Sequence, residues 1–145
     1  MYNPFSLEGK TILVTGASSG IGRGTAIECA KMGAKVVLSG RNEVRLQETL
    51  VSMEGDGHIV LCGDLNSDEI RKEVVDKMPT LNGVVHCAGI LQIKMAKFMD
   101  GAFIEDMFQT NVFSPMMLST LLIKKKRLLK QSSIIFCFSF SYNSM

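Results

Sequence analysis

Three glycines that follow a short apolar run form the part of the sequence best suited to chemistry. The run TILVT (residues 11–15) is continuous and apolar, which predicts a buried strand, and TGASSGIG follows it with Gly16, Gly20 and Gly22. A glycine-rich turn between a strand and a helix directs free backbone N–H groups and the positive end of the helix dipole at one point. We therefore expect a phosphate group to bind at this turn.

Each glycine has a separate expected role. Gly16 lets the chain turn sharply, Gly20 lets a ligand approach the backbone, and Gly22 lets the helix pack close to the sheet. The alternative is that the turn needs its glycines for structural reasons alone. The loop lacks Gly-Lys-Ser/Thr and the spacing Gly-x-Gly-x-x-Gly, which excludes two other types of phosphate loop.

The elements that must position this turn alternate between short strands and longer helices. Such alternation predicts an α/β fold of the Rossmann-like, doubly wound type, in which a parallel sheet carries helices on both faces in three αβα layers. Asn42 is a candidate cap for the second helix, and Asn66 or Ser67 for the third. The expected strands are residues 11–15, 35–39, 58–62, 83–87 and a fifth that begins at 133, and the expected helices are residues 20–33, 42–53, 67–78 and 102–129.

Composition excludes several classes of protein. The chain has 145 residues, 46% hydrophobic and 21% charged, which suits one globular domain, and its net charge of +2 gives no argument for nucleic acid. The longest apolar runs fall short of the ~20 residues of a membrane span, and the first ten residues lack the apolar core of a signal peptide, so we expect a cytoplasmic protein.

The KKKR run (124–127) fits the end of the long helix better than a targeting patch. The four cysteines form no Cys-x-x-Cys pair and lie in apolar runs, which predicts reduced core thiols and no metal site.

The spacing T-G-x-x-x-G-x-G resembles the cofactor loop of the short-chain dehydrogenase/reductase family. GDL (63–65), HCAG (86–89) and TNVFSP (110–115) are similar, in the same order, to three further family motifs, although HCAG replaces both asparagines of the family's N-N-A-G. The resemblance extends from about Leu7 to Phe138. It implies that the cofactor is bound by Gly16, Ser18, Ser19, Gly20, Ile21, Gly22, Arg41, Asp64, Leu65, Cys87, Ala88 and Gly89.

The end of the second strand favours NADP over NAD. An NAD site usually places a carboxylate on the ribose about 20 residues beyond the glycines, and Gly40 stands there with Arg41 next to it. Arg41 can pair with a 2′-phosphate, or it is simply a surface arginine. Ser19 weakens the preference, because many NADP-preferring relatives carry a basic residue at that place. Asp64 is expected near the adenine, with capping of the following helix as the alternative. His86 is expected to be a strand-end histidine whose hydrogen bonds are satisfied, and not a catalytic base.

The resemblance also assigns reacting groups. Family members use a tyrosine as the acid, a lysine that lowers its pKa, a serine on the substrate oxygen and a helix asparagine that holds a water. Asn111 matches this asparagine and Ser139 matches the serine, but Tyr-x-x-x-Lys is absent and no lysine follows Lys130. Tyr142, three residues after Ser139, is expected to be tail.

We therefore expect residues 1–138 to be the N-terminal portion of an NAD(P)-binding Rossmann domain that stops after its fifth strand, with residues 139–145 an atypical tail. A shifted reading frame or alternative end would explain this tail, and a natural short relative is the competing explanation. The expected function at family level is that of an NADP-dependent oxidoreductase acting on a small carbonyl or alcohol, with negligible turnover in this chain.

Two rival hypotheses are a non-catalytic nucleotide-binding module and a nonfunctional remnant. Family members are homo-oligomers, and the resemblance implies the same for this chain. Here the fifth strand is expected to be an exposed apolar edge, because IIFCFSF combines strong β propensity with no charge and no proline. We expect self-association or aggregation, and no membrane or nucleic-acid partner.

Overall fold

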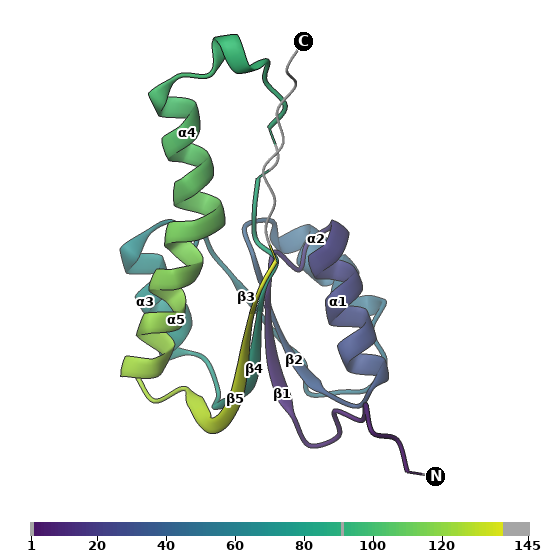
Figure 1. Ribbon diagram of the computed structural model, residues 1–145. Coiled ribbons are helices and arrows are strands. Elements are labelled where there is room, and N and C mark those ends of the chain that lie inside the picture. The colour runs from purple at the N-terminus through teal and green to yellow at the C-terminus, as the bar shows by residue number, and fades with distance from the viewer. Residues whose placement is uncertain (1, 91, 138–145) are drawn as a thin grey trace.

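The computed structural model describes residues 2–90 and 92–137, and their architecture is a parallel five-stranded sheet between two layers of helices (Figure 1). The strand order is β3-β2-β1-β4-β5. This confirms the predicted Rossmann-like, doubly wound fold. The strands are β1 (Thr11–Thr15), β2 (Lys35–Gly40), β3 (Ile59–Cys62), β4 (Leu81–His86) and β5 (Leu128–Phe136).

The helices divide between the two faces of the sheet. Figure 1 shows α1 and α2 on one face and α3 with the long α4–α5 rod on the other. The rod contains a five-residue π-helical segment, η2, between α4 and α5. The bounds are α1 (Gly20–Lys31), α2 (Glu43–Val51), α3 (Asp68–Asp76), a short 3₁₀ turn η1 (Ala96–Phe98), α4 (Gly101–Phe108), η2 (Gln109–Phe113) and α5 (Ser114–Lys124).

Adjacent residues of the central strand supply both halves of the core. Val14 packs into the cluster on the α1 side and Leu13 into the cluster on the α3 and α5 side, and both are fully buried. A strand covered on both faces needs apolar residues at successive positions, which explains why residues 11–15 do not alternate. The core therefore fixes β1 in register with β2 and β4 and sets the place where the glycine loop begins.

Two predicted helix caps are confirmed. Asn42 Oδ1 accepts a hydrogen bond from the Arg45 amide at 3.0 Å, and Ser67 Oγ accepts one from the Ile70 amide at 3.4 Å. Asp64 instead accepts from the Asn66 amide at 3.0 Å within the loop after β3. Asp64 is therefore not the cap of α3.

The long helix ends earlier than predicted, and the fifth strand begins earlier. Lys126 adopts φ 54°, and the Lys126 and Arg127 amides donate to the Ile123 and Leu122 carbonyls at 3.0 and 2.8 Å. These paired bonds form a Schellman motif, which usually has glycine at the position that Lys126 occupies. The prediction of a helix to residue 129 was wrong because the lysine gave no stop signal, and β5 starts at Leu128.

β5 lies at an edge of the described sheet. It pairs with β4, and Leu129, Ile135 and Phe136 on it are 46%, 53% and 43% exposed. The predicted exposed apolar edge is present in the described structure, while self-association stays a prediction. No helix in residues 2–90 and 92–137 is long and apolar enough to cross a membrane.

The expectation that all four cysteines belong to the core is wrong for two of them. Cys29 and Cys87 are partly buried, but Cys62 and Cys137 are exposed, and all four thiols are free. Both exposed cysteines lie at the carboxyl ends of the two edge strands, where fewer neighbours cover a side chain. The apolar residues around Cys62 and Cys137 predict a strand, but they do not show whether that strand lies at the centre or at the edge of the sheet. The exposure of the two thiols could therefore not be predicted.

Candidate nucleotide-binding site

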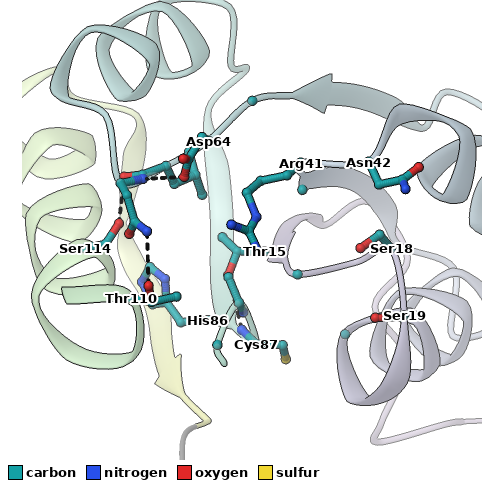
Figure 2. A pocket seen from close by; sticks show the side chains of 18 of the residues that line it. Thr15, Ser18, Ser19, Arg41, Asn42, Asp64, His86, Cys87, Thr110 and Ser114 are labelled. Carbon is teal, nitrogen blue, oxygen red and sulfur yellow. Dashed lines mark hydrogen bonds between the residues drawn. The ribbon is translucent and has the colours of Figure 1, made fainter. Parts of the chain in front are cut away.

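A pocket of about 930 Å³ opens at the carboxyl ends of the strands, where the strand order reverses between β1 and β4. Open α/β sheets bind their ligands at this switch point. The loop after β1 and the loop after β2 form one wall, and the loop after β3 with the α4–α5 rod forms the other (Figure 2).

The glycine loop is held by two very close backbone approaches. Gly16 has φ 64°, and a Cβ there would lie 2.6 Å from the Ala88 nitrogen. A Cβ on Gly22 would lie 2.1 Å from the Gly16 carbonyl oxygen. The predicted role of Gly22 therefore needs a correction, because Gly22 lets α1 pack against the loop itself and not against the sheet.

The N-terminus of α1 faces the pocket without a side-chain cap. Ser19, at the N-cap position, makes no capping hydrogen bond in the described structure, and the first turn has no acidic residue. By contrast, α2, α3 and α4 are capped by Asn42, Ser67 and Asp100. The free amides and the dipole of α1 suit an anion. A Cβ on Gly20 would meet nothing within 4 Å, so the space beside these amides is open.

Arg23 anchors the outer side of this loop, a role that sequence reasoning missed. Its Nη2 donates to the Ser18 carbonyl at 2.7 Å, and its Nε donates to the Thr49 hydroxyl at 3.0 Å. That hydroxyl donates in turn to the Ala17 carbonyl at 2.8 Å. The network ties α1, α2 and the loop together, and a cation within the first turn of a helix was the available sequence signal.

Thr15 fixes the floor of the pocket. Its hydroxyl oxygen accepts hydrogen bonds from the Cys87 and Ala88 amides, each at 3.1 Å. The chain after β4 is thereby held against the start of the glycine loop. This close approach requires glycine at position 16, because a Cβ there would meet the backbone of Cys87 and Ala88.

The opposite wall is fastened to the helical rod at two points. The side-chain nitrogen Nδ2 of Asn66 donates to the Thr110 hydroxyl at 3.0 Å, and the Ser114 hydroxyl donates to the Leu65 carbonyl at 2.6 Å (Figure 2). The same carbonyl accepts from buried Arg71 at 2.5 Å. These bonds place Asp64 and Leu65 on the pocket wall.

Arg41 lies on the first wall, and in Figure 2 its side chain points into the pocket. Gly40 before it has no carboxylate, and a Cβ there would lie 3.6 Å from the Ser18 hydroxyl. An acidic side chain at position 40 would therefore stand next to the glycine loop. Arg45 and Glu43 line the same rim.

His86 lines the floor of the pocket, and Asn111 lies behind it. His86 is 2% exposed, its Nε2 is 2.8 Å from the Ser119 hydroxyl, and it stacks on Phe136 with 4.8 Å between the ring centroids. Burial lowers the pKa of His86 from 6.5 to about 4, so its ring is neutral at pH 7. Asn111 is buried in η2 and hydrogen-bonds to the Ile90 backbone.

The structure brings together the twelve residues that the sequence predicted for cofactor binding, since all of them line this pocket. Asn111 is next to the pocket but does not line it, and a Cβ on Gly89 would lie 3.0 Å from its Oδ1. Ser139 and Tyr142 lie outside the described residues. Further lining residues that the sequence did not single out for cofactor binding are Thr15, Gly40, Asn42, Glu43, Val44, Arg45, Gly63, Asn66, His86, Thr110, Ser114, Pro115 and Leu118.

Comparisons with known proteins agree with this arrangement. The family model described as short chain dehydrogenase matches residues 10–142. The uncharacterized oxidoreductase YciK of Escherichia coli K12 is 33% identical over 127 residues, covering 81% of this chain and 50% of that protein. The 3-oxoacyl-[acyl-carrier-protein] reductase FabG of Rickettsia prowazekii is 33% identical over 135 residues, covering 89% of this chain and 56% of that protein.

Solved structures give the same result. A short-chain dehydrogenase structure from Shigella flexneri superposes with a TM-score of 0.76 at 32% identity, covering 91% of this chain and 63% of that one. A gluconate dehydrogenase structure from Agrobacterium tumefaciens gives a TM-score of 0.78 at 26% identity, covering 84% and 51%. This chain spans about half the length of the curated relatives it matches. Because the family model matches residues 10–142, which are most of this chain, the chain belongs to the short-chain dehydrogenase family.

Proposed function

We propose that the pocket binds NADP, with NAD as the weaker ligand. The observation that carries this proposal is the pairing, in one pocket, of the uncapped N-terminus of α1 with Arg41. The amides of α1 would hold the pyrophosphate, which explains the open space at Gly20. Asp64 and Leu65 would contact the adenine end from the opposite wall.

The charges on the rim support the phosphate form of the cofactor. Arg41 and Arg45 are the cations there and Glu43 is the acid, while Gly40 leaves the usual place of the NAD carboxylate without charge. A guanidinium pairs with a phosphate through two parallel hydrogen bonds. We assign the 2′-phosphate to Arg41, which directly follows Gly40.

At family level the activity is that of an oxidoreductase acting on a small carbonyl or alcohol, with the bound nicotinamide supplying or accepting hydride. The 145 residues contain no Tyr-x-x-x-Lys. We therefore propose that this chain binds the nucleotide with negligible turnover. Four free thiols fit a reducing compartment such as the cytoplasm.

Two variants test the cofactor assignment by titration calorimetry. Arg41→Ala removes a charge-assisted contact worth about 1.5–3 kcal/mol, so NADP affinity should fall by about tenfold or more while NAD affinity stays constant. Gly40→Asp should lower the ratio of NADP to NAD affinity, because a carboxylate repels the 2′-phosphate. Lys72→Ala, at an exposed position of α3, is the matched loss of a cation and should change neither affinity. Equal losses for both cofactors in Arg41→Ala would contradict the assignment.

A further inference from the structure

Two thiols lie side by side at the carboxyl ends of β4 and β5. The strands are parallel with His86 opposite Phe136, so Cys87 and Cys137 occupy the next position of each strand. The Cys137 amide donates to the His86 carbonyl at 2.9 Å, which continues the ladder by one residue. Fifty positions in sequence separate the two cysteines, and the sheet alone brings them together.

The side chains of this pair also meet. The Cys137 thiol contributes to the raised pKa of Cys87 and Thr25 of α1 acts against it, so both side chains lie close to the Cys87 sulfur. Neighbouring strands are roughly 4.8 Å apart, which falls within the range of Cα separations that a disulfide spans. The register of β4 and β5 therefore places the two residues at a Cα separation that a disulfide can span. In residues 2–90 and 92–137, no group of three histidine, cysteine, aspartate or glutamate side chains could hold a metal ion.

We propose that Cys87 and Cys137 form a redox-sensitive dithiol that closes to a disulfide with peroxide and thereby changes the cofactor pocket. Cys87 lines that pocket, whereas Cys137 is exposed beside it. The consequence for the pocket rests on the proposed NADP binding. Formation of the bridge depends only on the two thiols and the sheet.

The two cysteines have different roles in the reaction. Burial raises the pKa of Cys87, so the exposed Cys137 reacts first. Its thiolate attacks one oxygen of hydrogen peroxide, forms a sulfenic acid and releases hydroxide, which takes up a proton to give water. The Cys87 sulfur then attacks the Cys137 sulfur and displaces the hydroxyl group as a second water. Two thiols are oxidised, one peroxide is reduced, and two waters leave.

The bridge and the cofactor should oppose each other. The bridge draws the Cys87 sulfur toward β5 and stiffens the segment whose backbone contacts Gly16. A nucleotide in the pocket covers Cys87 and should slow the closure. Because such coupling is reciprocal, the oxidised chain should bind NADP about tenfold more weakly.

Oxidation of the full chain with hydrogen peroxide tests the proposal. Intact mass should fall by two hydrogen atoms, and trypsin should release peptide 78–94 joined to peptide 131–145. Cys137→Ser should abolish the joined peptide and keep NADP affinity after peroxide. Cys62→Ser removes the other exposed thiol, and Cys29→Ser removes a further thiol close to Cys87. Both variants should still form the joined peptide.

Three results would overturn the proposal. The first is a bridge from Cys87 to Cys29, and the second is stable sulfenic or sulfinic acid at Cys137 without a joined peptide. The third is a bridged chain whose NADP affinity equals that of the reduced chain. A reduced chain that binds no NADP would contradict the proposed function alone, because the joined peptide is detected without cofactor.

Discussion

Both polar atoms of the Asn111 carboxamide hydrogen-bond to the backbone of Ile90. Asn111 Oδ1 accepts from the Ile90 amide at 2.7 Å, and Nδ2 donates to its carbonyl at 3.0 Å. The π-helical segment is thereby fastened to the chain that follows β4, beside Gly89 of the pocket. In this structure Asn111 holds the chain after β4 in place, and its role in the reaction stays a prediction.

Removal of this pair of bonds should be costly. Asn111→Leu keeps the side-chain volume but leaves the Ile90 amide and carbonyl without their partner, so the free energy of unfolding should fall by about 1–3 kcal/mol. Urea unfolding followed by circular dichroism measures this. Gln109→Ala, two residues away in the same segment, is the control and should have a smaller effect. An unchanged urea midpoint in Asn111→Leu would contradict the structural role.

Two neighbouring glycines of α1 should respond to alanine in opposite ways. Gly22→Ala would place a methyl group 2.1 Å from the Gly16 carbonyl oxygen, so the loop must move. We expect lower stability and loss of the NADP-induced rise in Tm. Gly24→Ala meets nothing within 4 Å and should stabilise the helix by about 0.5–1 kcal/mol. Thermal unfolding of both variants, with and without NADP, decides the matter, and similar behaviour of the two would disprove the close approach.

Buried His86 should make stability depend on pH. Its pKa in the folded chain is about 4, below the unfolded value of 6.5, so the unfolded state takes up the proton first as pH falls. The contribution of His86 is therefore complete above pH 6.5 and is lost between pH 6.5 and about 4, with a total of about 3 kcal/mol.

His86→Asn should flatten the pH dependence of the free energy of unfolding in that window, while the carboxylates contribute equally to both proteins. Denaturant unfolding at a series of pH values measures the slopes. An NMR titration that finds His86 protonated near pH 6.5 in the folded chain would refute the prediction.

The left-handed lysine at the end of α5 gives a stability test. Lys126 has φ 54°, a left-handed conformation that glycine adopts without steric cost. Lys126→Gly should therefore raise the free energy of unfolding by about 1 kcal/mol. Lys124→Gly, in the last turn of the same helix, should lower it by about 1 kcal/mol. Chemical unfolding of the two variants supplies the comparison, and a loss of stability in Lys126→Gly would be inconsistent with the Schellman end.

The sequence predicted the order of elements and the composition of the pocket well, because both follow from local patterns. The glycines, the buried strands and the caps at Asn42 and Ser67 each depend on residues close in sequence. In a doubly wound sheet these patterns also fix which loops meet at the switch point. The family resemblance assigned Arg41, Asp64 and Cys87 to one site, and all three line the pocket at this switch point.

What the sequence did not reveal depends on contacts between distant segments or on unusual residues. Lys126 ends a helix without the expected glycine. The anchoring by Arg23 and the pairing of Asn111 with Ile90 depend on hydrogen bonds that no periodic pattern encodes. The proximity of Cys87 and Cys137 follows from the register of β4 and β5, which apolar runs alone do not fix.

The measurement that tests the account most directly is thermal unfolding of the purified chain, alone and with equal excess of NADP or NAD. We predict one cooperative transition whose Tm rises with both cofactors and more with NADP, because a ligand at 100 times its Kd stabilises the folded state by about 2.7 kcal/mol. The absence of a transition, the absence of a shift, or a larger shift with NAD would contradict the assignment of this pocket to NADP.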